Sequence, residues 1–536
     1  MKNTPKEALK HLLGEIPYTA ELYWLIRQHG KPIASRFSLE RLNLAIPGIV
    51  EETRALKLNN PDPKRVFIFA SMHFWIDIVT LTALGLAASG NEITFGYYPY
   101  ADWYTNQSKF DLRRQNIYTR KVLNQASSVI KPISLLTYRA SFTPLPKALQ
   151  EAVNEVTVFD TQYALQIEDI DPNWPMYKLR LKRNLETAQS LLTLLRHDKP
   201  DVVVVPNGTV MEFGIVYRVA RFLNIPAVTF EFGDQTERIW LAQNSEIMRH
   251  DTDALWEGFG KEPITEEHRK MLVELVSARR SARLRGSMAR KWQGVPIEGT
   301  LKLRKTLGLD DRPVVLLATN VLGDSLTLGR QVFSKTMAEW IKRTVKFFLD
   351  KEDIQLIIRV HPGEMFTQGT SMVDVVQAIV AELPEHIHLI GPEEKINTYD
   401  IVEAADLGLV YTTTVGLEMA MAGIPVIVAG KTHYSERGFT HDPKNWKAYL
   451  TLLSSMLEDL TKYRLSSEQV ELAWRYAYLF FFEFPLPFPW HIQQWRDDIK
   501  ERPIAYVLSE EGQRKYGDTF RYLVGEKLDW VARGKE

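Results

Sequence analysis

The chain reads Ile354-Gln355-Leu356-Ile357-Ile358-Arg359-Val360-His361-Pro362-Gly363-Glu364 and, after the next expected strand, Thr412-Thr413-Thr414-Val415-Gly416-Leu417-Glu418. Each stretch lies where an apolar run ends in a polar turn. A helix from Leu417 to Ala422 follows the second turn, and a strand from Pro425 to Ala429 follows that helix. This alternation predicts a parallel α/β sheet, in which ligands bind beyond the carboxyl ends of the strands.

The Thr-rich turn has the composition of a nucleotide site. Thr412, Thr413 and Thr414 place three hydroxyl groups at the start of a helix, where N–H groups favour a phosphate. Glu418 lies one helical turn beyond Thr414, so both side chains can face one ligand. The Glu418 carboxylate could accept hydrogen bonds from the hydroxyl groups of a ribose. A ribose-binding carboxylate beside a phosphate site predicts that the ligand is a nucleotide. The alternative places Glu418 on a solvated helix face.

The His-Pro turn adds further candidate donor-binding residues. His361 follows a strand, so its ring can donate to a phosphate oxygen, and Arg359 could add a charge-assisted contact. Alternation along the strand could instead turn Arg359 to the opposite face. His361 could equally be a turn residue that the backbone satisfies. Glu364 completes the same turn and is counted with these candidates.

Two other loops lie at the same expected edge. Asn320-Val321-Leu322-Gly323-Asp324-Ser325 follows the strand Val314 to Ala318, and its glycine could let Asn320 and Asp324 approach a ligand, or the loop is an ordinary connection. The loop Gly391 to Asn397 lies where a base could bind, which makes Asn397 a candidate. Thr398 could cap the helix that continues through Ile401 to Ala404.

The first part of the chain repeats the α/β pattern. Strand Val66 to Ala70, helix Ile76 to Ala88 and strand Ile93 to Tyr98 form one unit. Strand Val202 to Val205, helix Val210 to Leu223 and strand Ala227 to Phe230 form another. The residues between them are mostly helical, with Leu179 to Arg196 as the clearest helix.

A catalytic base is expected at the carboxyl edge of this first sheet. Glu231 ends the last of these strands, and a carboxylate there can accept a proton from an acceptor hydroxyl if its pKa is raised. His73 and Asp77, one helical turn apart after the first strand, are the rival candidates. Each of the three could also be structural.

Residues 278–312 contain a basic run from Arg279 to Lys291, two glycines and Pro296, and mark the expected domain boundary. Residues 1–295 then form a Rossmann-like domain with helical insertions, and residues 296–465 form a second one. Two doubly wound domains of this kind would face a central cleft. The basic run itself is expected on a solvated helix face.

Composition restricts the class of protein. The chain has 536 residues, 66 Lys+Arg and 66 Asp+Glu, so no global field favours nucleic acid. It has no Cys, no stretch of signal-peptide type and no uncharged apolar run of membrane-helix length. The expected protein is a soluble cytoplasmic enzyme.

Two local segments are ambiguous. Asp169-Ile170-Asp171 has the spacing of a cation-binding motif, but it lies in a charged stretch without a strand, so we expect a loop and no metal. The aromatic segment 480–490 could touch a membrane surface or a lipid-linked acceptor. Packing where the tail crosses between domains is the favoured alternative.

From about Val314 to Pro443 the chain resembles the bacterial capsule-polysaccharide biosynthesis glycosyltransferases, a GT-B group that includes Kdo transferases. The blocks that carry the resemblance are Asn320 to Ser325, Arg359 to Glu364, Thr412 to Glu418, Gly423 to Val426, Gly430 to Tyr434 and Gly438 to Thr440. Glu418 is similar to the ribose-binding Glu of many GT-B enzymes. Glu231-Phe232-Gly233 is similar to the motif that supplies the base, although Phe232 replaces one carboxylate of the usual acidic pair.

The resemblance implies metal-independent transfer from a nucleotide-activated sugar, linked to CMP, UDP or GDP, with no other cofactor. The acceptor would be a glycan or a lipid-linked molecule, and the enzyme could contact the inner face of the membrane. Residues 466–536 would form a helical segment that returns to the first domain. A nucleotide-sugar 2-epimerase-like enzyme and a non-catalytic nucleotide- or glycan-binding subunit are the alternatives. Donor, acceptor, stereochemistry, oligomeric state and the role of residues 1–200 stay open.

Overall fold

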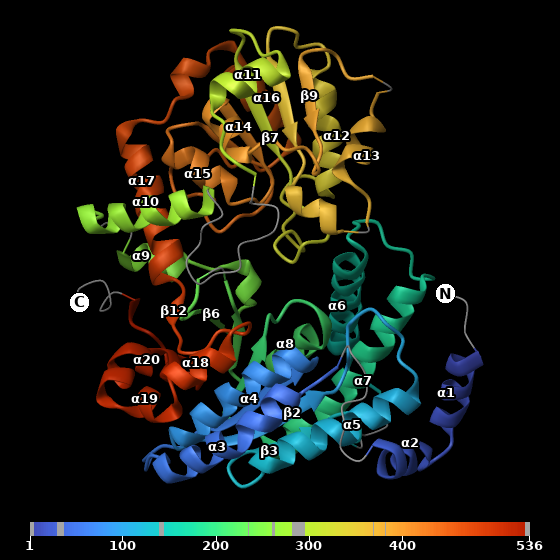
Figure 1. Ribbon diagram of the computed structural model, residues 1–536. Coiled ribbons are helices and arrows are strands. Elements are labelled where there is room, and N and C mark those ends of the chain that lie inside the picture. Colours follow the sequence, from blue (N-terminus) through green and yellow to red (C-terminus); the bar gives the residue numbers. More distant parts are fainter. Residues whose placement is uncertain are drawn as a thin grey trace. The chain divides into compact units, whose positions relative to one another are not determined.

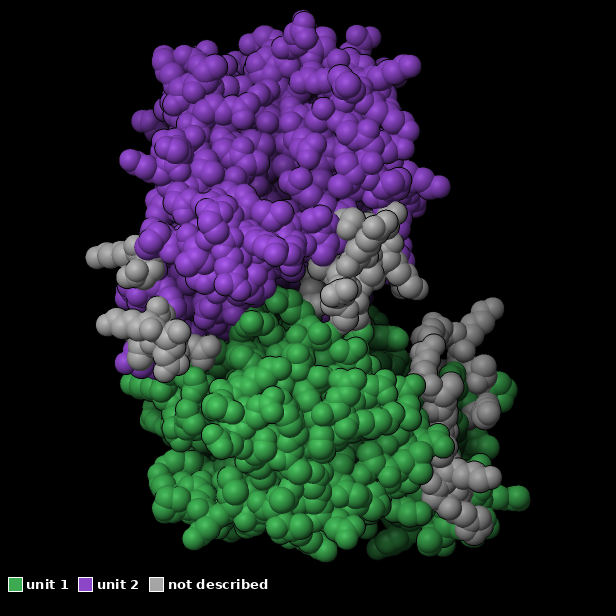
Figure 2. All heavy atoms as spheres, turned by 60° about the vertical axis from the view of Figure 1, so that its left-hand side comes forward, with its two compact units in different colours: residues 1–160, 171–248, 485–528 green, residues 161–170, 249–484, 529–536 purple. Residues whose placement is uncertain are grey.

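The computed structural model describes residues 5–28, 37–138, 144–233, 235–259, 263–280, 295–367, 369–380 and 382–530. The chain divides into two compact units (Figure 2). Unit 1 consists of Met1–Asp160, Asp171–Met248 and Pro485–Leu528, and unit 2 consists of Thr161–Ile170, Arg249–Phe484 and Asp529–Glu536. The sequence placed the boundaries after residues 295 and 465. In the structure the main part of unit 2 begins at Arg249, after the short excursion Thr161–Ile170, and the chain returns to unit 1 at Pro485.

Unit 1 is built on a seven-stranded sheet with the order β12-β6-β5-β4-β1-β2-β3. Its strands are β1 (Arg65–Ser71), β2 (Glu92–Tyr98), β3 (Lys131–Ser134), β4 (Val202–Pro206), β5 (Ala227–Glu231), β6 (Arg238–Gln243) and β12 (Leu486–Pro487). Strands β1 to β5 are parallel, whereas β6 and β12 are added antiparallel. The parallel part, β3-β2-β1-β4-β5, has the doubly wound order of a Rossmann-like domain. The four strands expected here are confirmed, and β3, β6 and β12 were missed.

The helices of unit 1 include one that is almost entirely enclosed. They are α1 (Pro5–Glu15), α2 (Thr19–Tyr23), the π-helix η1 (Trp24–Gln28), α3 (Glu40–Leu56), α4 (His73–Ala88), α5 (Lys109–Leu123), η2 (Asn124–Ala126), α6 (Lys147–Leu165), α7 (Pro175–Asp198), α8 (Met211–Phe222), α18 (Trp495–Glu501), α19 (Ile504–Leu508) and α20 (Glu510–Leu523). Every residue of α4 from Trp75 to Ala88 is buried. A Cβ atom added to Gly85 would lie 2.9 Å from Phe520 and 3.0 Å from Trp490. The last segment of the chain therefore packs directly on this central helix.

Unit 2 contains a five-stranded parallel sheet with the order β11-β10-β7-β8-β9. Its strands are β7 (Val314–Ala318), β8 (Gln355–Arg359), β9 (Ile387–Ile390), β10 (Leu407–Val410) and β11 (Val426–Val428). This is again the doubly wound order, and the strand order reverses between β7 and β10. The prediction of two Rossmann-like α/β domains is confirmed, although the sequence missed β9.

Helices cover both faces of the second sheet. The helical elements of unit 2 are α9 (Asp253–Phe259), α10 (Glu266–Arg280), α11 (Thr300–Leu307), α12 (Met337–Phe348), η5 (Pro362–Phe366), α13 (Met372–Gln377), α14 (Thr398–Ala404), α15 (Val415–Met421), α16 (Trp446–Glu458), η6 (Leu460–Tyr463), α17 (Ser467–Tyr478) and η7 (Leu479–Glu483). The short helix η3 (Ile247–Arg249) lies where the chain passes from unit 1 to unit 2. Trp340 of α12, Met372 of α13 and Tyr449 of α16 share one core with β7 and β8. Helices α14 and α15 lie on the other side (Figure 1).

Contacts of α9 and α10 explain why unit 2 begins before the predicted boundary. Arg269 of α10 forms a 2.6 Å ion pair with Glu471 of α17, and Trp256 of α9 lies edge-on to Tyr476 of the same helix, with centroids 5.6 Å apart. Both partners come from the second domain, so the two helices belong to its fold. The sequence offered no signal for these long-range contacts.

The aromatic segment 480–490 is an internal part of the structure. Its buried side chains are Phe480, Phe481, Phe484, Phe488 and Trp490. The chain changes from unit 2 to unit 1 between Phe484 and Pro485, so the packing alternative for this segment is confirmed. Among the described residues, no helix has the length and apolar character needed to cross a bilayer.

Candidate functional site

The centre of the candidate donor site is the point in unit 2 where the strand order reverses. Asn320 follows β7 and Thr412 follows β10, and the Asn320 Oδ1 atom accepts a 3.1 Å hydrogen bond from the Thr412 N–H. Thr319 Oγ1 accepts a 3.1 Å hydrogen bond from the His361 N–H, which follows β8. Three turns are thus fixed to one another at the carboxyl edge, where parallel α/β sheets bind their ligands.

The His361 ring has a defined proton position. Its Nδ1 atom accepts a 3.0 Å hydrogen bond from the Gly363 N–H, so the neutral ring carries its proton on Nε2. The turn therefore satisfies one nitrogen, as one alternative for His361 expected. The other nitrogen has the donor character that a phosphate oxygen requires.

The three threonines of the second turn have different roles. Thr413 holds the turn, because its Oγ1 atom accepts from the Val415 N–H at 3.4 Å and its carbonyl accepts from the Tyr434 hydroxyl at 2.6 Å. Thr414 is the N-cap of α15, without a side-chain cap bond. The Thr412 Oγ1 atom is buried and has no hydrogen-bond partner among the described residues. A hydroxyl of this kind can donate a hydrogen bond to a polar ligand.

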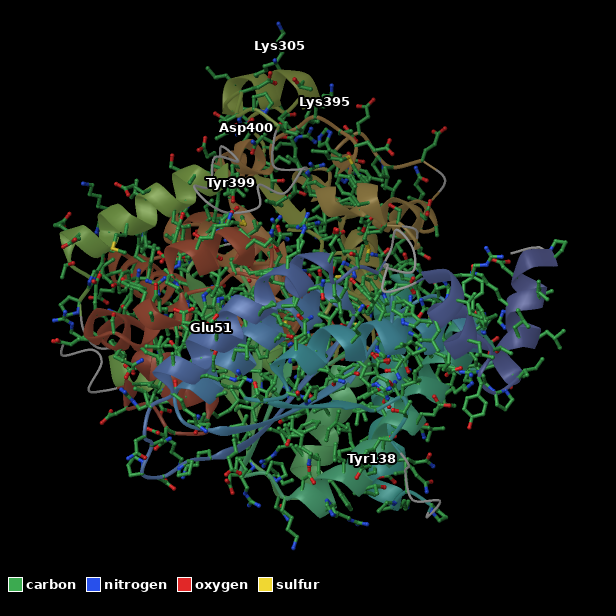
Figure 3. All side chains as sticks on the ribbon, turned by 60° about the horizontal axis from the view of Figure 1, so that its bottom comes forward. Glu51, Tyr138, Lys305, Lys395, Tyr399 and Asp400 are labelled. Carbon is green, nitrogen blue, oxygen red and sulfur yellow. The ribbon has the colours of Figure 1, made fainter. Side chains whose placement is uncertain are left out.

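Glu418 is buried on the first turn of α15 and is not on a solvated face. Its Oε1 atom accepts a 3.4 Å hydrogen bond from the Tyr399 hydroxyl and forms a 3.4 Å ion pair with Arg279 Nε. Tyr399 and its neighbour Asp400 come from α14 (Figure 3). Burial first, and then the Glu418 charge, raise the pKa of Tyr399 well above its usual value, so it stays a donor.

The contact with Arg279 corrects the interpretation of the basic run. Arg279 is the penultimate residue of α10, its side chain is 17% exposed, and it pairs with Glu418. Arg280 forms a 3.2 Å ion pair with Glu403 of α14. These two arginines therefore bind the second domain and do not form a solvated face. The rest of the run, from Arg283 to Lys291, lies outside the described residues.

Arg359 and Asn397 build a loop beside the site. The Arg359 guanidinium donates to the carbonyls of Gly391 at 2.6 Å and Ile396 at 3.2 Å. Burial lowers the pKa of Arg359 to about 10, against the pull of Glu394. Asn397 is the N-cap of α14, accepting from the Tyr399 N–H at 2.8 Å, so the expectation that Thr398 caps this helix is wrong. An Asn accepts the cap bond as well as a Thr does.

Asp324 and Glu364 also make local structural contacts. Asp324 Oδ1 accepts a 2.8 Å hydrogen bond from the Leu326 N–H within its own turn. Glu364 Oε2 accepts from the Ser371 hydroxyl at 2.8 Å and from the Met372 N–H at 3.1 Å, at the start of α13. A Cβ atom at Gly323 would lie 2.2 Å from the Gln162 carbonyl oxygen. That glycine therefore allows close backbone packing, as in an ordinary connecting loop.

Glu231 ends β5 at the carboxyl edge of the first sheet, as expected. The Asn207 side-chain amide donates a 3.2 Å hydrogen bond to its Oε2 atom. Burial raises the pKa of Glu231 to about 7, and the hydrogen bonds from Phe232 N–H and Asn207 oppose that shift. A carboxylate that titrates near neutral pH is suited to general-base catalysis.

The rival pair lies near the start of α4, with His73 as its first residue and Asp77 one turn further on. Burial raises the pKa of Asp77 to about 8, while Arg41 and a hydrogen bond with Trp495 oppose the shift. Burial, with a smaller effect of Arg41, lowers the pKa of His73. Burial thus favours the protonated form of Asp77 and the neutral form of His73.

The two base candidates share one region of unit 1. The Trp75 ring, from the start of α4, lies 6.2 Å from the Phe232 ring after β5. The His491 ring lies 5.2 Å from Phe232. The sequence did not identify five residues that contact the candidate site residues or their turns, namely Asn207, Arg279, Tyr399, Tyr434 and His491. Only Asn207, within its Pro-Asn-Gly turn, carried a local signal.

The described residues contain no group of three or more His, Asp or Glu side chains arranged to hold a metal ion. Asp169 and Asp171 lie in the loop between α6 and α7, as predicted. Asp171 Oδ1 accepts a 2.8 Å hydrogen bond from the Asn173 N–H.

Comparison with known proteins supports the family resemblance. Residues 283–458, about a third of the chain, match the model of the family described as capsule polysaccharide biosynthesis protein. These residues include all the predicted donor-binding candidates. The predicted resemblance to capsule-polysaccharide biosynthesis proteins is therefore confirmed over this segment. No curated protein matches the chain.

The solved structures that are similar to the chain include the following three. The beta Kdo 2,4 transferase of Thermosulfurimonas dismutans KpsC is 17% identical, with a TM-score of 0.35 over 51% of this chain and 78% of its own. The beta Kdo 2,7 transferase of the same protein is 14% identical, with a TM-score of 0.31 over 54% and 79%. The UDP-GlcNAc 2-epimerase from Neisseria meningitidis, bound to UDP-GlcNAc, is 13% identical, with a TM-score of 0.25 over 78% and 99%.

Proposed function

We propose that the chain is a glycosyltransferase of capsule-type polysaccharide biosynthesis, which moves a sugar from a nucleotide-activated donor to a glycan or lipid-linked acceptor. The observation that carries the proposal is the arrangement at the β7–β10 edge. There the buried, unpartnered Thr412 hydroxyl and the His361 turn are fixed to the Asn320 loop, beside the buried carboxylate of Glu418. The match of this segment to a capsule-biosynthesis family supports the same function.

The donor nucleotide would bind at the carboxyl edge of the second sheet. The Thr412 hydroxyl and the Nε2–H of His361 would donate to phosphate oxygens, which are good acceptors of charge-assisted hydrogen bonds. Glu418 would accept hydrogen bonds from the ribose. Arg279 and Tyr399 hold this carboxylate in place through its Oε1 atom. Arg359, Asn397, Asp324 and Glu364 would act indirectly, by holding the loops around the nucleotide.

Glu231 would be the general base of the reaction. Its carboxylate would take the proton of an acceptor hydroxyl while that oxygen forms a bond to the anomeric carbon of the donor sugar. The bond from that carbon to the phosphate oxygen would break, and the nucleotide would leave with the electron pair. A base with a pKa of about 7 is ionised in part at neutral pH and still basic enough to accept the proton.

The proposed reaction needs no metal ion and no cofactor besides the donor itself. Hydrogen-bond donors from side chains and the backbone would stabilise the negative charge of the leaving phosphate. In other transferases a divalent cation has this role. We place the enzyme in the cytoplasm, where nucleotide sugars would be available. Addition of a chelator should leave turnover unchanged, whereas a metal requirement would overturn this part of the proposal.

The decisive experiment is a calorimetric titration of the purified chain with CMP, CDP, UDP, GDP and dTDP. Binding of one nucleotide, weakened by Thr412→Val and unchanged by the exposed control Thr370→Val, would support the donor site and give the donor class. Binding of none would overturn the proposal. Turnover of the matching nucleotide sugar without an acceptor would favour an epimerase-like enzyme. Binding without any turnover in the presence of glycan acceptors would favour a non-catalytic subunit.

A further inference from the structure

The first helices of unit 1 expose apolar side chains at helical spacing. Leu9 and Leu12 of α1 and Ile16 directly after it are 54%, 63% and 46% exposed. Leu22 of α2 and Leu25 and Ile26 of η1 are 55%, 64% and 65% exposed. Residues three or four positions apart lie on one face of a helix, so each helix presents an apolar stripe to solvent. These six residues are called the N-terminal apolar surface below.

The opposite face of the same helices already holds them on the protein. Trp24 is buried, and the Tyr23 ring packs edge-on against Phe110 of α5 at 5.6 Å. Arg113 of α5 donates to the carbonyls of Gly14 and Ile16 at 3.2 and 2.9 Å. Figure 1 shows α1 and α2 beside α5 at the margin of unit 1. The N-terminal apolar surface is therefore a second apolar face, beyond the one that folding uses.

Tyrosine side chains border this surface. Tyr18, between the two stripes, is 73% exposed, and Tyr23 is 44% exposed. Tyrosine has an apolar ring and a polar hydroxyl, and it concentrates at the boundary between water and lipid. An aliphatic centre with exposed tyrosines is the composition of a helix that lies in a bilayer interface.

The charge of the surrounding elements is positive in a neutral chain. The elements α1, α2, η1 and α5 contain eight basic residues and four acidic ones, a balance of +4, whereas the whole chain has a net charge of +0. The basic residues are Lys6, Lys10, Arg27, Lys109, Arg113, Arg114, Arg120 and Lys121, and the acidic ones are Glu7, Glu15, Glu21 and Asp111. Glu15, Glu21 and Asp111 are each ion-paired to a basic residue of this set. Arg114 is buried and also pairs with Asp111, whereas Arg27, Arg120 and Lys121 are exposed, and their charge complements anionic lipid headgroups.

We propose that α1, α2 and η1 form a membrane-docking surface that lies on a bilayer containing anionic lipid. The aliphatic side chains of the N-terminal apolar surface enter the boundary between headgroups and acyl chains, and the basic residues attract the anionic headgroups. The aromatic segment 480–490, which the sequence offered for this role, is buried and cannot perform it. The inference does not depend on the donor site or on the identity of the base.

The test is co-sedimentation of the full chain with phosphatidylcholine vesicles, with and without phosphatidylglycerol. The double variant Leu12→Asp/Leu25→Asp places two charges in the N-terminal apolar surface. The control Leu44→Asp/Leu301→Asp adds the same two charges at positions that are 74% and 85% exposed in α3 and α11. All four leucines are exposed, so thermal midpoints should change little, and circular dichroism confirms that each variant is folded.

We expect the wild type and the control to bind vesicles that contain phosphatidylglycerol, more tightly than pure phosphatidylcholine. The Leu12→Asp/Leu25→Asp variant should bind at least about tenfold more weakly, because charged residues cannot enter the interface without a cost. Failure of the wild type to bind, or equal binding by both double variants, would overturn the proposal. Self-association of the wild type that this variant alone abolishes, without vesicle binding, would assign the surface to a second copy of the chain instead.

Discussion

The Asn320 side chain and the Thr412 backbone are joined by a 3.1 Å hydrogen bond across the point where the strand order of the second sheet reverses. Asn320 is 8% exposed, and Thr412 is equally buried. The bond therefore holds the Thr-rich turn against the loop that follows β7. The position of Thr412, one of the two candidate phosphate-binding residues, therefore depends on the Asn320 side chain.

Asn320→Ala should weaken nucleotide binding by about tenfold, because a buried N–H loses its partner and the turn that carries Thr412 relaxes. Calorimetry with the nucleotide found for the wild type measures the effect, and Asn173→Ala in an exposed loop is the control. Asn320→Asp keeps an acceptor oxygen but adds a negative charge. It should bind nucleotide even more weakly, and wild-type affinity in this variant would show that no phosphate lies nearby.

Glu418→Gln should separate ribose recognition from phosphate recognition. The amide keeps the size of the carboxylate but loses the ion pair with Arg279 and one acceptor oxygen. Affinity for the nucleotide should fall by about tenfold, the value of one charge-assisted hydrogen bond. Affinity for pyrophosphate, which has no ribose, should stay the same. If both ligands lose affinity equally, Glu418 acts by holding Arg279 and Tyr399 rather than by binding the ribose.

Glu231→Gln should reduce kcat/KM by about 10² to 10⁴ while donor affinity persists, since general-base catalysis contributes this much. The wild-type rate should rise with pH up to about pH 7 as Glu231 loses its proton, and the residual rate of the variant should lack that rise. Asp77→Asn is the matched control, and its rate should stay within a few-fold of the wild type. A large loss in Asp77→Asn together with a small one in Glu231→Gln would move the base to α4.

The same carboxylate should make stability depend on pH. The folded chain raises the pKa of Glu231 from the ordinary 4.5 to about 7. Between these two values the unfolded chain loses a proton that the folded chain keeps, so this residue lowers stability progressively as pH rises through the window. Glu231→Gln removes the penalty. Its thermal midpoint relative to the wild type should increase from pH 4.5 to pH 7 and stay constant above, whereas an unchanged difference would contradict the raised pKa.

Local sequence pattern was sufficient for most of the fold. Fully apolar runs such as Val202 to Val205 and Val314 to Ala318 are strands, because only a sheet covered on both faces buries them completely. The missed strands lie towards the edges, where this signal fails. β3 contains Pro132, and β6 is a half-buried antiparallel strand with Arg238 and Trp240 on it.

Only one aspect of the candidate site could be predicted from the sequence, namely which residues lie in the turns at the ends of the strands. Thr412 and Asn320 follow strands, so their place at the carboxyl edge follows from the topology. The direction in which a side chain points does not follow from the topology. Arg359 was expected to contact a phosphate, but its guanidinium donates to the Gly391 carbonyl and holds that loop. Arg279 lies far from Glu418 in sequence, on a helix whose packing no local pattern describes. The same limit applies to buried networks such as the one around Arg180.

Arg180→Met should destabilise unit 1 by about 3–5 kcal/mol, because it leaves two buried carboxylates without their counter-charge. Arg180 is fully buried in α7, where Nε pairs with Asp160 and Nη2 with Glu212, each at 3.0 Å. Glu212 also accepts a 3.4 Å hydrogen bond from Ser71 at the end of β1. Chemical denaturation measures the loss, and the exposed Arg196→Met in the same helix should change stability by less than about 0.5 kcal/mol. Adding Asp160→Asn and Glu212→Gln to Arg180→Met should restore part of the loss, since the uncompensated charges are then removed. Equal stability of the Arg180 and Arg196 variants would show that the buried ion network contributes nothing to the fold.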